Sequence, residues 1–202
     1  MRQPLEHRFV CNYLKTHICN TYFYNMLLIQ LTGLSGSGKT TIAKLAKISL
    51  EEMGYETEIL DGDEYRKHLC KGLGFSRQDR IENIHRMGIV GSLLSKHKII
   101  SIIAAINPYE EARNHLKKSG DFVKTVFIDC PVEVARHRDT KGLYKRAQLP
   151  EDHPEHVSHF TGISDPFEVP ATPDLVIKTE AEKPEQSATQ LVEFIIKSIH
   201  NM

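Results

Sequence analysis

Apolar positions along the chain recur at two periods, and the two alternate from residue 27 onward. Short apolar runs have the length of strands, and the most continuous ones are typical of strands buried on both faces. They lie at Leu27–Leu31, Glu56–Leu60, Ile99–Ile106, Val123–Ile128 and Leu175–Lys178. Segments with helical spacing lie between or after them, at Lys39–Met53, Arg77–Lys96, Tyr109–Ser119, Pro131–Asp139 and Lys183–Ile199. Strands that alternate with helices predict an α/β fold, with a mainly parallel sheet and helices on both of its faces.

Residues at the ends of these segments support the expected helix boundaries. Gly54 follows the first helical segment, where a glycine is a common cap. Ser76, with Asp79 three residues later, is an N-cap signature before the longest helix. Pro131 suits the first turn of another. These residues predict where at least three helices begin or end.

Residues 140–174 break the alternation. The segment contains Pro150, Pro154, Pro166, Pro170 and Pro173, which excludes long regular elements. Long irregular loops in compact domains are often functional. We therefore expect a lid at about residues 140–170, within a single domain spanning residues 26–202.

The first 25 residues fit neither class of targeting segment considered. They have no apolar core, unlike a secretory signal, and no serine, unlike a transit peptide. Met26 directly precedes the first predicted strand. Residues 1–25 are therefore either an N-terminal extension or the result of a start assigned upstream of Met26.

Composition narrows the classes of function. Lys plus Arg and Asp plus Glu both number 26 in the chain of 202 residues, so net charge gives no support for nucleic-acid or membrane-surface binding. No apolar run is long enough to span a bilayer. The cysteines (Cys11, Cys19, Cys70, Cys130) form no CxxC pair, which favours reduced thiols and a cytoplasmic location. His153, His156 and His159 are interrupted by Pro154, so we interpret them as an exposed loop rather than a metal site.

A phosphate-binding motif follows the first predicted strand and opens the first helix. It fits the pattern G-x-x-x-x-G-K-[ST], in which backbone N–H groups and a helix N-terminus face the phosphates. We expect Lys39 to reach the β- and γ-phosphates of ATP and Thr40 to ligate Mg²⁺. No guanine-reading NKxD pattern occurs, which argues against a GTPase. The residues expected to bind the nucleotide are Gly33, Leu34, Ser35, Gly36, Ser37, Gly38, Lys39, Thr40 and Thr41.

Acidic and basic residues follow the second predicted strand, at the edge where ligands bind in open α/β sheets. Asp61 and Asp63 can hold Mg²⁺ with Thr40, and Asp63 can orient or deprotonate an attacking hydroxyl. Arg66 lies one helical turn from Asp63 and suits an anion. A solvated acidic turn is the alternative. We therefore expect Lys39 and Asp63 to be the catalytic residues.

Further candidates lie around the start of the longest helix. Arg80 and Asn83 are three residues apart and share a helix face. Phe75 precedes them and can stack on a base. Judged from these residues alone, a core phenylalanine and a solvated charged face are the better explanation of the pattern.

Five sequence blocks in register resemble the adenylylsulfate kinase family over about residues 27–179. Besides the phosphate-binding motif, they are Asp61–Arg66 with Leu73–Asn83 (DGDxxR and LGFSxxDRxxN), Ile106–Tyr109 (INPY), Arg138–Ala147 (RDTKGLYKRA) and Phe160–Glu168 (FTGISDPFE). The resemblance implies a P-loop kinase fold with a lid. It also implies transfer of the ATP γ-phosphoryl group to the 3′-hydroxyl of adenosine 5′-phosphosulfate (APS), which gives 3′-phospho-APS and ADP.

The resemblance also implies roles for individual residues. Phosphosulfate would bind to Arg66, Arg80 and Asn83, and the adenine of APS would lie between Phe75 and Phe160. Lys141 would belong to the lid and contact the substrate. The full set of implied substrate-binding residues is Asp63, Arg66, Phe75, Arg80, Asn83, Ile106, Asn107, Lys141, Leu143 and Phe160.

This sequence departs from the family pattern at four places. Asn107 stands where the family has a serine once proposed as a phosphoryl carrier, and an amide is no such nucleophile, so we expect direct in-line transfer. Thr140 replaces a proline, Leu149–His159 is longer than the family's link, and residues 1–25 match nothing in the pattern.

Two alternative functions remain at this point. One is another small-molecule P-loop kinase, against which the basic residues and the two phenylalanines argue. The other is a non-catalytic nucleotide-binding partner of an ATP sulfurylase, against which the intact Lys39, Thr40, Asp61 and Asp63 argue. The resemblance further implies a homodimer and an ATP sulfurylase in the same pathway.

Overall fold

The computed structural model describes residues 26–201. The predictions about residues 1–25, with Cys11 and Cys19, therefore lie outside the described residues. Five parallel strands form one sheet in the order β2-β3-β1-β4-β5. The strands are β1 (Leu28–Thr32), β2 (Thr57–Asp61), β3 (Ile100–Ala104), β4 (Val123–Asp129) and β5 (Leu175–Lys178).

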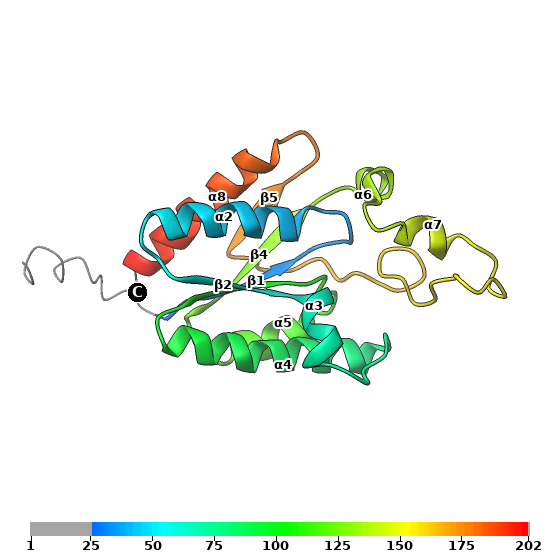
Figure 1. Ribbon diagram of the computed structural model, residues 1–202, viewed down its shortest axis with the longest axis horizontal. Helices are drawn as coiled ribbons and strands as arrows, with labels where there is room; N and C mark the ends of the chain where they lie inside the picture. The colour runs from blue at the N-terminus through cyan, green and yellow to red at the C-terminus, as the bar shows by residue number, and fades with distance from the viewer. Residues whose placement is uncertain (1–25, 202) are drawn as a thin grey trace, which may run out of the picture.

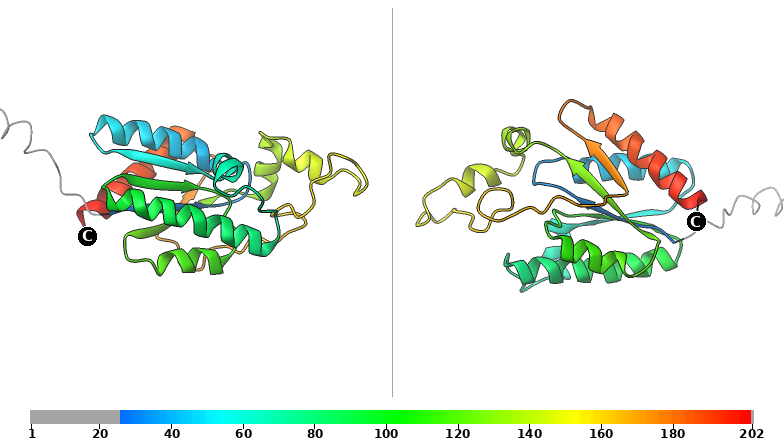
Figure 2. Two further views of the ribbon diagram at one scale, coloured as in Figure 1. Left: turned by 60° about the horizontal axis from the view of Figure 1, so that its bottom comes forward. Right: turned by 180° about the vertical axis from the view of Figure 1, so that it is seen from behind.

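Helices cover both faces of this sheet, as Figure 1 shows. One layer holds α2 (Lys39–Glu52) and α8 (Pro184–His200), and the other holds α4 (Arg77–Lys96) and α5 (Glu110–Lys117). Three short helices lie beyond the carboxyl ends of the strands: α3 (Gly62–His68), α6 (Val132–Arg138) and α7 (Leu143–Ala147). The two views of Figure 2 show the segment that contains α7 projecting past the sheet. The predicted parallel α/β fold is confirmed.

Strand β1 shows why the apolar runs are continuous. All five of its residues are buried, because side chains on both faces of the strand meet a helical layer. Ile29 and Leu31 pack in the core beneath α2 and α8. Leu28 packs in the opposite core, against α4 and α5. The central strand therefore ends at a fixed point between both layers, where the phosphate-binding motif begins.

The element boundaries agree with the predictions to within two residues, and two helices were not predicted. The Ser76 hydroxyl accepts a hydrogen bond from the Asp79 amide at 3.2 Å and caps α4 as expected. The missed helices, α3 and α7, contain seven and five residues. Such short helices show too few turns for an apolar period to be recognised.

The predicted lid segment (residues 140–170) packs on a small core that it shares with Cys130 and α6. Tyr144 and Phe160 are buried and meet edge to face, with ring centroids 4.8 Å apart. Asp139 directly precedes the segment and caps α7, because its carboxylate accepts the amides of Tyr144 and Lys145, both at 3.0 Å. Despite its prolines, the segment is therefore an ordered part of the fold. Between residues 26 and 201, no helix combines the length and apolarity needed to cross a membrane.

Candidate active site

The phosphate-binding motif curls tightly between β1 and α2. Gly33 adopts φ +153°, and a Cβ there would lie 2.5 Å from the Ile128 carbonyl oxygen on β4. Only glycine tolerates this approach of two strands. Gly36 and Gly38 also have positive φ angles, of 76° and 103°. The loop therefore turns its backbone inward and delivers the N-terminus of α2 to the cavity, the arrangement that binds phosphate.

Lys39 lies inside this loop. Its ammonium donates to the carbonyl oxygens of Gly33 (2.9 Å) and Leu34 (2.6 Å) and to the Ser37 hydroxyl (3.3 Å). Burial, together with the nearby Lys141 ammonium, lowers the pKa of Lys39 from 10.5 to about 7, against the opposing charges of Asp63 and Asp61. All three acceptors are neutral oxygens. The loop is therefore a preformed site for negative charge, beside an amine that contacts no carboxylate among the described residues.

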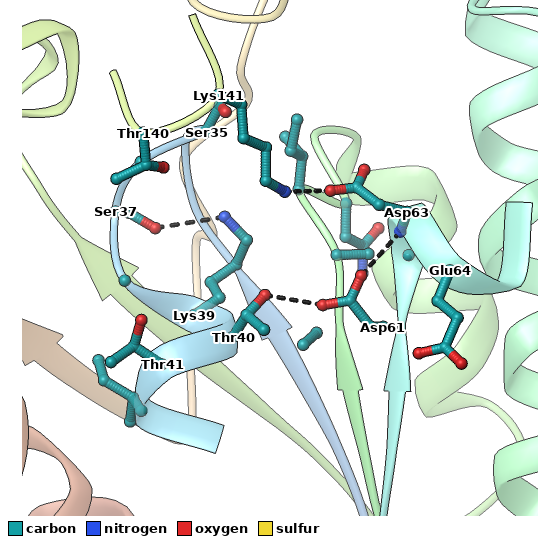
Figure 3. Close-up of a pocket in the computed structure, with 18 of the residues that line it drawn as sticks. Ser35, Ser37, Lys39, Thr40, Thr41, Asp61, Asp63, Glu64, Thr140 and Lys141 are labelled. Carbon is teal, nitrogen blue, oxygen red and sulfur yellow. Dashed lines mark hydrogen bonds and ion pairs between the residues drawn. The ribbon is translucent and has the colours of Figure 1, made fainter. Parts of the chain in front are cut away.

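Two carboxylates face the motif from the end of β2. The Thr40 hydroxyl donates to Asp61 Oδ2 at 2.8 Å, and Asp61 Oδ1 accepts the Asp63 amide at 2.9 Å. Asp63 lies in the first turn of α3, and its carboxylate forms an ion pair with Lys141 of the lid segment. Figure 3 shows these side chains pointing toward one another across the cavity from α2, β2 and the lid segment. The predicted metal ligands and the lid lysine therefore meet at one place.

On the other side of these carboxylates lie Arg66, Phe75, Arg80 and Asn83. The guanidinium carbons of Arg66 and Arg80 lie 4.6 and 5.4 Å from the centre of the Phe75 ring. Phe75 is 56% exposed. Asn83 is buried, and its Oδ1 has no hydrogen-bond partner among the described residues. Two cations, an exposed ring and an amide with an unpaired oxygen therefore form a surface that suits an anionic ligand with an aromatic base.

Asn107 lies in the loop that follows β3 and lines the cavity. Its side chain is buried and donates to Gln30 Oε1 at 3.0 Å. Its carbonyl oxygen accepts from the Thr32 hydroxyl at 2.9 Å and from Arg113 Nη1 at 2.7 Å. The residue adopts φ 45°, a conformation that asparagine tolerates better than most residues. Its interactions are those of a structural anchor, and its amide offers no nucleophile for phosphate.

Most of these groups line one cavity of about 1130 Å³. This volume exceeds the usual range for one drug-sized ligand, so there is room for two nucleotides. Of the residues predicted to bind nucleotide, substrate or metal, most line it. They are Ser35, Gly36, Ser37, Gly38, Lys39, Thr40, Thr41, Asp61, Asp63, Arg66, Phe75, Arg80, Asn83, Ile106, Asn107, Lys141 and Leu143.

Three predicted site residues do not line the cavity. Gly33 and Leu34 lie behind it and take part through their backbones, since their carbonyl oxygens hold Lys39. Phe160 is only 4% exposed and packs against Tyr144. The structure thus does not place Phe160 opposite Phe75, because the Phe160 ring is buried against Tyr144.

The sequence interpretation missed one part of the wall. Further lining residues lie near α2 and the end of β5, among them Lys44, Arg138, Thr179, Glu182, Pro184 and Ser187. Arg138 donates to the Thr179 carbonyl oxygen, and the Thr179 hydroxyl donates to the Ser37 carbonyl oxygen at 3.0 Å. The position of Thr179 in the sequence could have revealed this part of the wall. Thr179 directly follows a parallel strand, and the carboxyl ends of parallel strands meet at the edge of the sheet where ligands bind.

The donor atoms near Thr40 suit a hard cation. A hydroxyl and two carboxylates are oxygen ligands of the kind Mg²⁺ prefers, and Mg²⁺ usually completes its shell with water and phosphate oxygens. Within residues 26–201, no group of three or more His, Cys, Asp or Glu side chains is placed to hold a metal ion. The residues therefore fit a cation that arrives with nucleotide phosphates better than a permanently bound one.

Comparisons with known proteins agree with this geometry. The profile of the adenylylsulphate kinase family matches residues 25–178. An adenylyl-sulfate kinase of Gloeothece citriformis is 46% identical over 165 residues, which cover 81% of this chain and 90% of that protein. The structure of the Mycobacterium tuberculosis APS kinase in complex with AMPPNP and APS is similar with a TM-score of 0.80 and 34% identity, covering 86% of this chain and 99% of that chain.

The chain is also similar to a family member that forms an oligomer. The hexameric APS kinase from Thiobacillus denitrificans matches with a TM-score of 0.62 and 26% identity, over 86% of this chain and 29% of that chain.

Proposed function

The chain belongs to the adenylylsulfate kinase family, and on this premise we propose how its own residues phosphorylate APS. The protein is an ATP-dependent kinase that transfers the γ-phosphoryl group to the 3′-hydroxyl of APS, giving 3′-phosphoadenosine 5′-phosphosulfate and ADP. The observation that carries this assignment is a single cavity with two different ends. A phosphate-binding loop lies at one end, two guanidinium groups beside an exposed ring lie at the other, and carboxylates lie between them.

At the donor end, the loop of Gly33–Thr40 holds the phosphates of ATP through its backbone amides and Lys39. The ammonium of Lys39 already lies within the loop, so binding replaces neutral oxygens by phosphate oxygens without a large displacement of the side chain. Such preorganised charge stabilises the transition state in phosphoryl transfer. The nucleoside of ATP then extends toward Arg138, Thr179 and Pro184, which line the remaining wall.

At the centre, Asp63 receives the proton of the attacking hydroxyl, and Thr40, Asp61 and Asp63 would hold Mg²⁺. When bound, Mg²⁺ neutralises charge on the phosphates. Lys141 pairs with Asp63 and keeps a positive charge beside the reacting groups from the lid side. Because Asn107 provides no nucleophile, the phosphoryl group passes directly from ATP to the substrate hydroxyl.

At the acceptor end, Arg66, Arg80 and Asn83 bind the phosphosulfate, because guanidinium forks match the oxygens of phosphate and sulfate. Phe75 supplies an exposed face for the adenine. Phe160 presents a second face only if the lid segment moves, since its ring is now packed against Tyr144. Ile106 and Leu143 contribute apolar wall on either side.

We further propose that the protein works as a homodimer in the cytoplasm, supplied with APS by an ATP sulfurylase. Cys70 and Cys130 are free thiols, as expected in a reducing compartment. The assembled APS kinase among the similar structures supports self-association in general. Light scattering during size-exclusion chromatography would measure the mass in solution, and a monomeric mass would exclude the dimer.

The function is tested by ADP release in a coupled assay with APS, adenosine or gluconate as the acceptor. Of the three acceptors, we expect only APS to support ADP release, with 3′-phospho-APS as the second product. The Lys39→Ala variant is expected to lose turnover by orders of magnitude while keeping its melting temperature, because the transition-state charge loses its partner. Faster turnover with gluconate or adenosine would instead identify another small-molecule kinase, and ATP binding without any turnover would identify a non-catalytic protein.

A further inference from the structure

Arg80 is held by the Phe75 carbonyl oxygen and by His159 and Asp165, two residues that do not line the cavity. Its guanidinium is almost fully buried, and Nε donates to the Phe75 carbonyl oxygen at 3.0 Å while Nη2 donates to the His159 carbonyl oxygen at 2.6 Å. The carboxylate of Asp165 lies 3.4 Å from Nε. Nη1 has no acceptor among residues 26–201. The Arg80 guanidinium is thus hydrogen-bonded to the protein through Nε and Nη2, and Nη1 is available to a ligand.

Asp165 is itself fixed in place. Its Oδ2 accepts from the hydroxyl of Tyr109 at 3.0 Å, and Tyr109 is 1% exposed. Its backbone amide donates to the Phe160 carbonyl oxygen at 3.1 Å, and its carbonyl oxygen accepts the Gly162 amide at 2.8 Å. The Phe160–Asp165 turn therefore presents a carboxylate whose position is set both by its own backbone and by a buried phenol.

The same turn touches the phosphate-binding loop. Gly162 has φ +87°, and a Cβ at this position would lie 2.7 Å from Leu34 Cδ2. Turn and loop are therefore in close contact, and Asp165 on the far side of the turn meets Arg80 of α4. Burial lowers the pKa of Arg80, and the strongest influence raising it again is the charge of Asp165. The carboxylate thus offsets part of the cost of burying this guanidinium.

We propose that Asp165, anchored by Tyr109, is a positioning residue that orients the Arg80 guanidinium toward the phosphosulfate of APS. This inference rests on the proposed function, because it takes Arg80 to bind the acceptor substrate. Asp165 is not part of the cavity wall, so it acts through Arg80. A side chain that is already oriented loses less conformational freedom when the anion binds, and this raises affinity. The prediction is specific to the acceptor, since the ATP phosphates lie at the other end of the cavity.

The test compares Asp165→Asn, Tyr109→Phe and the matched control Glu168→Gln. Glu168 lies in the same segment, but its carboxylate lies near Arg77 (3.8 Å) and accepts the Glu110 amide (2.6 Å), away from Arg80. KM values for APS and ATP and the dissociation constant of APS are measured for each variant. We expect Asp165→Asn to weaken APS binding about tenfold, the scale of coupling between contacting groups. Tyr109→Phe should weaken it less, and Glu168→Gln should leave it unchanged.

A second substitution separates positioning from general damage. In an Arg80→Lys background, adding Asp165→Asn should have no further effect on APS, because Lys lacks the fork that Asp165 orients. An undiminished effect in that background would overturn the proposal, as would a normal APS affinity in Asp165→Asn. Equal losses of APS and ATP affinity, or a matching loss in Glu168→Gln, would also overturn it, since the carboxylate would then act on the fold or on the overall charge.

The orientation of Arg80 can be followed without substrate. In ¹⁵N-labelled ligand-free protein, the Arg80 Nε–H signal should exchange faster with water in Asp165→Asn than in the parent chain or in Glu168→Gln. Unchanged exchange would overturn the positioning role even if APS did not bind. If the parent chain binds ATP but not APS while this signal responds as expected, the proposed function fails and the positioning of Arg80 stands.

Discussion

Binding of ATP should take up a proton at Lys39. In the ligand-free protein the pKa of Lys39 is about 7, because its ammonium is buried and contacts neutral oxygens. About half of these side chains are therefore neutral at pH 7, and about nine-tenths are neutral at pH 8. Triphosphate oxygens next to the amine favour its charged form and raise its pKa. We expect uptake of about half a proton per ATP at pH 7 and about 0.9 at pH 8.

The sign of the pH dependence follows from this uptake. The bound state holds more protons than the free state, so raising the pH weakens ATP binding, by about fivefold between pH 7 and pH 8. Folding depends on pH in the opposite direction. The unfolded chain, with a lysine pKa near 10.5, binds more protons than the ligand-free fold between pH 7 and 10.5. In that range Lys39 makes the ligand-free protein more stable as the pH rises.

Isothermal titration calorimetry measures the uptake directly. ATP with saturating Mg²⁺ is titrated at pH 7 and pH 8 in buffers of different ionisation enthalpy, and the slope of the observed enthalpy gives the number of protons. Lys39→Arg should abolish the uptake, because a guanidinium stays protonated in both states. Lys44→Arg is the matched control, since Lys44 lines the same cavity but is exposed. No uptake at pH 8 in the parent chain, or the same uptake in Lys39→Arg, would refute the reasoning.

Three further substitutions and one truncation test other parts of the protein. Phe75→Ala should weaken APS binding by roughly 1–3 kcal/mol and leave ATP binding unchanged in competition titrations, whereas Phe160→Ala should also lower the melting temperature because that ring is buried. Asn107→Ala should lose roughly 1–3 kcal/mol of stability by leaving Gln30 Oε1 unpaired, yet keep turnover; a phosphoenzyme trapped with labelled ATP would contradict direct transfer. A chain that starts at Met26 should fold and turn over like the full chain, and an insoluble or inactive product would show that residues 1–25 are required.

Local patterns in the sequence were enough to predict the layers of the fold and the donor half of the site. The apolar strands, the caps at Ser76 and Gly54 and the motif from Gly33 to Thr40 depend on neighbours in the chain. Parallel strands also bring their carboxyl ends to one edge, so the meeting of Asp61 with Thr40 followed from topology alone. The family resemblance added the acceptor residues, most of which do line the cavity.

Contacts between distant segments were decided only by the tertiary structure. Lys141 meets Asp63 across 78 residues, and Arg80 meets the His159 carbonyl oxygen across 79. Neither pairing leaves a periodic signal, because each depends on how an irregular segment folds back over the sheet. The same holds for Phe160, which the sequence offers as a ring for stacking and the fold uses to pack Tyr144. The sequence thus determined which chemical groups this protein has, since their types and order are local properties. Which groups face the cavity and which support them from behind was decided by packing, because burial and orientation arise only when remote segments meet.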